Sequence, residues 1–176
     1  MQRIIMENFT NETIDTTQLP KFEEVVFTKL QPAYWKIILI QIAILFVLIS
    51  IGFGVITTNA EELAPFQLQI GLCIIGFLGL VLLFSRIGYN KKGFAFRQHD
   101  VLFRYGVIAT NTLIIPYNRI QHVALHEGIL SRFFGLAKIE IFTAGGHASD
   151  IEIPGIEKQQ AENIKQLLMG KIQKEL

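Results

Sequence analysis

Hydrophobic residues form two long uninterrupted blocks in the first half of the chain and short alternating runs in the second half. The first block, WKIILIQIAILFVLISIGFGVI, covers residues 35–56 and its one charge is Lys36. The second, FQLQIGLCIIGFLGLVLLF, starts at residue 66 and has no charge. At about 1.5 Å per residue, each can cross a hydrocarbon core of about 30 Å. Because a helix in a globular core keeps a polar face, the two blocks predict transmembrane helices at 35–56 and 66–85.

Charges near the two blocks predict how the helices are oriented. The connecting segment 57–65, TTNAEELAP, has two acidic residues and no Lys or Arg, whereas Lys and Arg flank the other ends of both blocks. Because Lys and Arg accumulate on the cytoplasmic side, we expect 57–65 to be an external loop and both termini to be cytoplasmic. Residues 1–34 are then a cytoplasmic lead-in, polar and largely irregular, with Met6 as an alternative start.

Residues 86–176 show a pattern of short strands. Runs such as GFAFRQHD, QHVALHEG and AKIEIFTAGG contain β-branched or aromatic residues and end at Asp or Gly. Six or seven runs of this kind predict a closed or bent antiparallel sheet rather than a parallel one. This part of the chain is long enough, at about 90 residues, to fold as one small domain.

The last twenty residues have a helical period. The apolar positions that recur at helical intervals are Ala161, Ile164, Leu167, Leu168 and Ile172. Pro154 and Gly155 predict a turn between the last strand and this helix. The predicted fold class is therefore two transmembrane α-helices followed by a mainly β domain, a bent sheet or open barrel with a C-terminal capping helix. That is the outline of a pleckstrin-homology (PH) domain.

The composition agrees with a membrane protein. Hydrophobic residues make up 51% of the 176 residues and charged residues only 18%, which is too apolar for an average soluble domain. The one cysteine, Cys73, lies inside the second block, so no intrachain disulfide is expected. We expect Cys73 to pack as a small hydrophobic residue.

The stretch HVALHEG raises the question of a metal site, because His122 and His126 are four residues apart. In a helix, two such side chains approach within about 6 Å and can share one zinc ion. In a strand they are roughly 13 Å apart, which is beyond the reach of ligand bonds of about 2 Å. Val123 and Leu125 alternate with polar neighbours, so the stretch predicts a strand and no zinc site.

Catalytic motifs are also weak. Ser131 or Ser149 can be combined with His147 and Asp150, but no GxSxG elbow is present and a chain of this size offers such trios by chance. We therefore expect a protein that is not an enzyme and needs no cofactor.

Basic residues outnumber acidic ones in the predicted domain. Residues 86–176 contain twelve Lys and Arg against eight Asp and Glu, a net charge of +4 beside an anionic leaflet. Lys91, Lys92, Arg97 and Arg104 fall on the first two predicted strands and are candidates for binding a lipid headgroup. The simpler interpretation, which we favour, is that the charges next to the helix only fix the topology.

Several short motifs together resemble a known family. They are Asn118, Arg119, Ile120, Gln121 and His122; Gly128, Leu130, Arg132, Phe134, Gly135 and Leu136; Thr143, Ala144 and Gly145; and Ile153, Pro154 and Gly155. With the preceding pair of blocks, this order resembles the YdbS-like bacterial membrane proteins, whose PH domain is of the second bacterial type. The resemblance covers residues 35 onward. It implies a bacterial plasma (inner) membrane protein with no known catalytic activity and a companion membrane protein that has several PH domains.

Four residues in the most family-like run are candidates for interaction. Arg119 and Arg132 are expected to be buried or half-buried struts that hold loop carbonyls. Phe133 and Phe134 are expected in a loop that inserts into the membrane surface or into a partner. The leading hypothesis is a non-enzymatic membrane protein whose cytoplasmic domain binds another protein, or a second copy of itself. The alternative is binding of an anionic lipid headgroup through the basic first hairpin.

Overall fold

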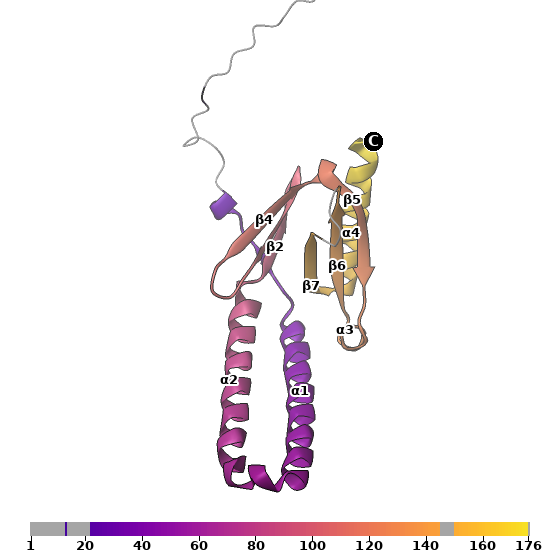
Figure 1. Cartoon of the computed structure of the whole chain (residues 1–176). Coiled ribbons are helices and arrows are strands. Elements are labelled where there is room, and N and C mark those ends of the chain that lie inside the picture. The colour runs from indigo at the N-terminus through magenta and orange to yellow at the C-terminus, as the bar shows by residue number, and fades with distance from the viewer. Residues whose placement is uncertain (1–12, 14–21, 145–149, 176) are drawn as a thin grey trace, which may run out of the picture.

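The protein consists of two long helices at one end and a β domain at the other (Figure 1). The structure, a computed structural model, describes residue 13 and residues 22–144 and 150–175. Helices α1 (Pro32–Asn59) and α2 (Gln67–Lys91) run antiparallel and are joined by the short helix η3 (Glu61–Phe66). Most of the predicted lead-in 1–34 lies outside the described residues.

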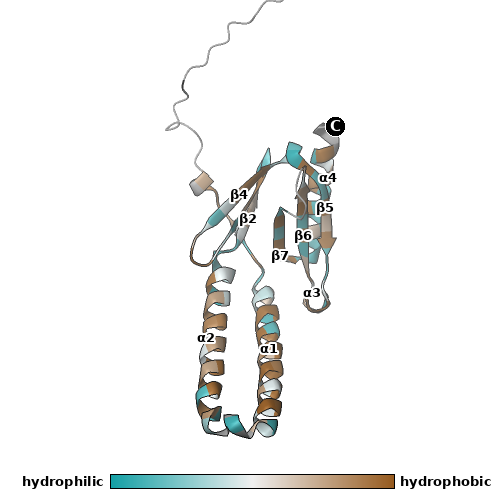
Figure 2. Cartoon of the chain, viewed as in Figure 1, coloured by the Kyte–Doolittle hydropathy of each residue, from teal (hydrophilic) through white to brown (hydrophobic). Residues whose placement is uncertain are grey.

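Helices α1 and α2 are long and apolar enough to cross a membrane. Their most apolar stretches have mean hydropathy values of 2.7 and 2.4, and only 6% of those residues are buried. Hydrophobic residues cover both helices along most of their length (Figure 2). Helix α1 extends the predicted span at both ends. It starts at Pro32, a residue suited to a first helical turn, and at its far end the side chain of Asn59 donates a hydrogen bond to the Val55 carbonyl at 2.7 Å.

The β domain contains two antiparallel sheets. The first has the order β1-β2-β3-β4 and the second the order β5-β6-β7. The strands of the first sheet are β1 (Thr28–Lys29), β2 (Gly93–Phe96), β3 (Asp100–Tyr105) and β4 (Asn111–Pro116). The strands of the second are β5 (Ile120–His126), β6 (Leu136–Thr143) and β7 (Ile151–Glu157). Six of the described strands, β2 to β7, lie within residues 86–176, which agrees with the six or seven predicted there, and the fold class is confirmed.

Three short helices and one long helix complete the described structure. They are η2 (Phe22–Glu24), η4 (Tyr117–Arg119), α3 (Ile129–Phe133) and α4 (Lys158–Glu175). Strand β1 comes from the segment expected to be a largely irregular lead-in, and it pairs with β2 immediately after α2 ends. The prediction missed this strand because two exposed residues, Thr28 and Lys29, leave no alternating pattern.

The core lies between the sheets and is closed by α4. Along β6, Ile139 and Ile141 are fully buried while Lys138 and Glu140 point the other way, as expected for the two-residue period of a strand. From α4, Ala161 and Leu168 are completely buried against this core and Ile164 and Ile172 are partly buried. The prediction that Leu167 also faces the core is wrong: its side chain is 48% exposed.

The predicted turn at Pro154 and Gly155 is also absent. Strand β7 continues through both residues, and they lie opposite a single residue of β6, since Ile153 pairs with Ile139 and Ile156 pairs with Ala137. This is a β-bulge, in which one strand accommodates an extra residue. Gly155 has a φ of +66°, which explains why glycine occupies the bulge.

Candidate functional site at the membrane junction

The start of α1 is packed directly against the bulge of β7. The Gln31 N–H donates a 2.9 Å hydrogen bond to the Gly155 carbonyl. The ring of Tyr34 lies so close that a Cβ placed on Gly155 would be 2.5 Å from the Tyr34 Cγ. The glycine therefore serves two needs, a positive φ and close approach of an aromatic ring.

Helix α2 reaches the same place through Tyr89. The Tyr89 hydroxyl donates to the Gln31 carbonyl at 3.3 Å, and its ring centroid is 5.6 Å from that of Trp35. The Arg86 guanidinium lies 4.8 Å from the centroid of the Trp35 ring, within the range of a cation–π contact. We call this meeting of α1, α2 and β7 the junction, defined by Gln31, Tyr34, Tyr89 and Gly155. It ties both helices to the second sheet.

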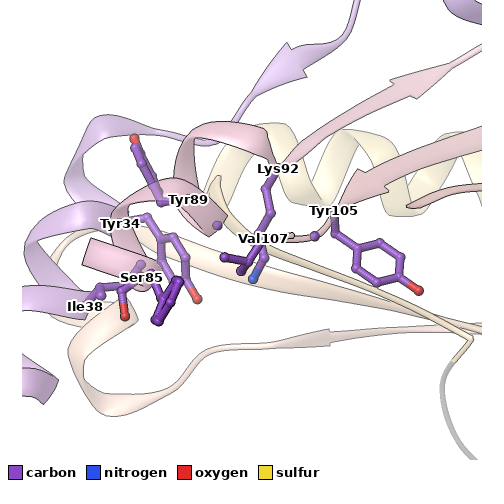
Figure 3. A pocket seen from close by; sticks show the side chains of 10 residues that line it. Tyr34, Ile38, Ser85, Tyr89, Lys92, Tyr105 and Val107 are labelled. Carbon is purple, nitrogen blue, oxygen red and sulfur yellow. The ribbon is translucent and has the colours of Figure 1, made fainter. Parts of the chain in front are cut away.

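Two adjoining pockets open beside the junction, and we call them together the junction groove. One has a volume of about 500 Å³ and lies between the ends of the two helices that adjoin the β domain and the loop after β3. The other, of about 510 Å³, extends toward β6 and β7. Both are lined by Tyr34, Lys92 and Tyr105. Figure 3 shows the Lys92 side chain beside Val107 in the first pocket, with Tyr34, Ile38 and Ser85 also lining it.

The charges of the junction groove are unevenly distributed. Burial lowers the pKa of Lys92, and the nearby Glu152 carboxylate opposes this effect. Lys138 forms ion pairs with Glu140 and, at 3.1 Å, with Glu152. The hydrogen bond to Glu140 is the main reason that the pKa of Lys138 is raised. The groove thus has one amine in a desolvated position and a second amine that is held between carboxylates.

The architecture described above, an antiparallel β domain with a C-terminal helix on two apolar helices, agrees with comparison to known proteins. The family model for the bacterial PH domain matches residues 25–172. The chain belongs to this bacterial PH-domain family. The matched range includes β1, α1 and α2, and in this chain the two long helices lie between β1 and β2.

Two relatives from Bacillus subtilis (strain 168) are similar to this family member. The UPF0699 transmembrane protein YdbS is 24% identical over 92 residues, which are 52% of this chain and 56% of YdbS. The UPF0699 transmembrane protein YdbT is 29% identical over 122 residues, which are 68% of this chain and 24% of YdbT. The matched regions are thus less than two thirds of either relative. No solved structure matches the chain.

Within the family fold, Arg97 is separated from the other three predicted lipid-binding residues, which lie at one end of the β2–β3 pair, where Arg104 is paired with Gly93. The Lys91 amine donates a 2.8 Å hydrogen bond to the Val107 carbonyl. Arg97 lies at the other end of β2 and forms two hydrogen bonds with Asp100, at 2.6 and 2.5 Å. The Arg104 guanidinium stacks 3.8 Å from the centroid of the Phe27 ring. Of the four, only Lys92 lines the junction groove.

The predicted interaction residues divide between the two ends of β5. Arg119 precedes β5, whereas Arg132, Phe133 and Phe134 lie in or next to α3, beyond its other end. Both arginines are exposed, so the prediction that they are buried or half-buried struts is wrong. The segment expected to be a loop forms the five-residue helix α3. Phe133 is 83% exposed, and Phe134 is half-buried and makes an edge-on contact with it.

The histidine motif has the predicted strand geometry. His122 and His126 both lie on β5, and the His122 ring stacks on that of Phe142 with centroids 4.2 Å apart. Among the described residues, no cluster of three or more His, Cys, Asp or Glu side chains is placed to hold a metal ion. His147 and Ser149 of the chance trio lie outside the described residues.

The sequence prediction missed the junction itself. Tyr34 was apparent only as an aromatic residue at the start of a span, and Gly155 only as a turn residue. A Pro-Gly pair inside a continuous apolar alternation, DIEIPGIE, is a signal for a bulge rather than a turn. No comparable signal connects that bulge to a tyrosine 121 residues earlier, because the contact is purely tertiary.

Proposed function

We propose that this protein is a non-enzymatic, two-span protein of the bacterial plasma membrane, and that its cytoplasmic PH domain binds a companion PH-domain membrane protein. The observation that carries the proposal is the exposed apolar face of α3. Ile129 and Phe133 are 91% and 83% exposed, and their spacing of four places them on one face of the helix. Exposed apolar residues that gather on one face are typical of a protein interface.

The position of α3 favours a partner in the same membrane. Helix α3 contacts α1, so α3 lies beside the end of a candidate membrane span. Arg132 lies between the two apolar residues in sequence, and Arg with aromatic residues is the composition of interface hot spots. Two spans already hold the protein in the bilayer, so further insertion of α3 would add nothing to its location. Binding a partner is a role that the spans do not fill.

A companion of the same family would supply matching surfaces. The similarity to YdbT shows that two different proteins of one bacterium, YdbS and YdbT, both have regions like this chain. The Lys and Arg residues that flank the spans support the proposed orientation, with both termini and the PH domain in the cytoplasm.

Photo-crosslinking in cells tests the proposal directly. A photoreactive residue replaces Phe133 in one strain and Ile108 in a second. Ile108 is 93% exposed but lies in the loop after β3, so it is the matched control. We expect a crosslink to another membrane protein, identified by mass spectrometry, from position 133 and not from 108. Crosslinks to lipid alone from position 133, with no protein adduct, would reject the proposal.

The alternative of headgroup binding through the basic first hairpin has less support. Lys91, Arg97 and Arg104 already use their charged groups within the protein, and Arg97 is at the opposite end of the strand from Lys91. Liposome binding by Lys91→Glu plus Lys92→Glu tests it. A loss of binding to anionic vesicles that Lys92→Glu alone does not produce would restore this alternative.

A further inference from the structure

The junction groove changes in polarity along its length. Its first pocket is lined mainly by apolar side chains, including Ile38 of α1, Phe84 of α2 and Val107 of the loop after β3. Its second pocket is lined by Lys138, Asp150 and Glu152, together with the phenol rings that both pockets share. An elongated ligand that fits this groove needs an apolar part toward the helices and a charged part toward the sheet.

We infer that the junction groove binds one phospholipid with a zwitterionic headgroup, placing the phosphate at Lys92 and the positively charged end toward Asp150 and Glu152. Helices α1 and α2 supply the apolar part of the site at membrane depth, where a lipid enters sideways from the bilayer. This site is separate from the α3 face and does not depend on the proposed protein partner.

Lys92 has the right position for a phosphate. It follows directly after α2, at the height where Trp35, Tyr89 and Arg86 form an aromatic and basic belt typical of a membrane interface. Lys92 lines both pockets together with Tyr34 and Tyr105, whose hydroxyl groups can donate hydrogen bonds to phosphate oxygens. The ammonium is partly desolvated, so a phosphate anion at this point would stabilise it.

The carboxylates beyond Lys92 select against a simple anion. Asp150 accepts hydrogen bonds from the Thr143 backbone N–H at 2.9 Å and from the Thr143 hydroxyl at 2.5 Å, which hold its carboxylate in place. Glu152 is attracted to Lys92 and paired with Lys138. Lys138 neutralises one charge here, but Asp150, Glu140 and Glu152 together outnumber it, so the groove beyond Lys92 remains net negative. A headgroup that is negative throughout would meet this net negative charge, whereas an ammonium group beyond the phosphate would be attracted to it.

Native mass spectrometry of the full chain in mild detergent tests the inference. The delipidated protein is titrated with phosphatidylethanolamine, with phosphatidylglycerol and with diacylglycerol, all with the same acyl chains. We expect one bound molecule of phosphatidylethanolamine, with an affinity about tenfold higher than diacylglycerol, the range of one charge-assisted hydrogen bond. We also expect it to bind several-fold more tightly than phosphatidylglycerol. Equal affinity for all three lipids would overturn the inference.

Two variants and a matched control locate the site. Lys92→Gln should remove the preference for phospholipid over diacylglycerol, and Glu152→Gln should remove only the preference for phosphatidylethanolamine over phosphatidylglycerol. Lys36→Gln makes the same charge change at an exposed position near the start of α1, outside the groove lining, and should retain both preferences. If Lys36→Gln and Lys92→Gln lose binding equally, the effect is one of general charge and the site is rejected.

A final arm separates a lipid from its free headgroup. Phosphoethanolamine has the same phosphate and ammonium groups but no acyl chains. We expect it to compete with the lipid only at concentrations at least a hundredfold higher. Competition at lipid-like concentrations would show that the groove binds a small soluble phosphate ester, and the lipid assignment would fall.

Discussion

The junction and α3 lie beside the same end of α1, but the aromatic side chain of the junction is packed within the protein whereas that of α3 is exposed. At the junction the Tyr34 ring is packed on Gly155 and near Tyr89. On α3 the Phe133 ring is 83% exposed. Tyr34 holds the domain on the helices and is covered by the protein itself, whereas Phe133 remains accessible to a partner. Aromatic residues near a membrane interface therefore do not by themselves identify an interaction surface. Only those that the rest of the chain leaves exposed are available to a partner.

The most damaging single change should be at the glycine that receives the Tyr34 ring. Gly155→Ala imposes a side chain at φ +66° and brings its Cβ to 2.5 Å from Tyr34, so the ring must move. We expect a loss of about 3–4 kcal/mol in the free energy of unfolding, measured by denaturant titration in detergent.

A matched glycine separates the two causes. Gly135 has nearly the same φ, +65°, but no atom lies within 4 Å of a Cβ built on it. Gly135→Ala should therefore cost only the backbone penalty of about 1–2 kcal/mol. Equal losses for the two variants would mean that the Tyr34 contact contributes nothing to the junction.

The aromatic pair itself should give the next largest difference. Tyr34→Ala removes a ring that packs on the bulge, and we expect a loss of about 2–3 kcal/mol. Phe133→Ala removes an aromatic ring of the same size from the exposed face of α3 and should change stability by less than about 0.5 kcal/mol. If Phe133→Ala destabilises the domain as much as Tyr34→Ala, α3 is part of the core and its exposed face is no longer a candidate interface.

Local sequence patterns predict a region well when its structure depends on neighbouring residues, and poorly when it depends on contacts between residues far apart in the chain. The spacing of apolar residues along the sequence indicates the spans, the strands and the C-terminal helix, so the type of each element was predicted correctly. Leu167 and Leu168 both fit the helical pattern, but only Leu168 faces the core, because adjacent residues differ by about 100° and the sheet determines the buried face. The junction depends on contacts between residues far apart in sequence, which no local pattern records.

The candidate site was predicted less well for the same reason. Lys91, Lys92, Arg97 and Arg104 are similar in sequence, and nothing local indicates that Asp100 and the Phe27 ring already engage two of them. Arg119 and Arg132 fall within one family-like run but are separated by the whole length of β5. Phe133 is exposed, as its insertion into a membrane surface or a partner would require, but its segment is helix α3 and not the expected loop, and the insertion itself stays a prediction.

The turn between β2 and β3, far from the junction, should show a smaller effect. Arg97 forms a bidentate pair with Asp100, and the Tyr117 hydroxyl donates to the Arg97 carbonyl at 2.6 Å. Arg97→Ala removes the partly exposed ion pair and should cost about 0.5–1 kcal/mol. It should leave phospholipid binding, measured by native mass spectrometry, unchanged. A loss of binding with normal stability would move the lipid site from the junction to the hairpin.

The smallest effect, and the one that best separates the two amines of the junction groove, is on the pH dependence of stability. Burial lowers the pKa of Lys92 below its usual value of 10.5, so the folded protein releases this proton before the unfolded chain does. Stability should therefore rise as the pH increases from the lowered pKa toward 10.5. Lys138 has a raised pKa, so its contribution is complete below 10.5 and is lost as the pH rises through the raised value.

Denaturant titrations of lipid-free protein between about pH 8 and 11 measure how the free energy of unfolding depends on pH. Subtracting the curve of each variant from that of the unchanged protein gives the contribution of Lys92 or of Lys138. Lys92→Gln should be neutral or stabilising by up to about 0.5 kcal/mol at pH 8 and should lack the rise below pH 10.5. Lys138→Gln should lose about 0.5–1 kcal/mol, because Glu140 and Glu152 then lose their cation. Both variants change one Lys to Gln in the same groove, so their opposite signs cannot come from net charge. The same sign for both would mean that Lys92 is solvated like a surface amine, which would remove the reason for a phosphate to bind beside it.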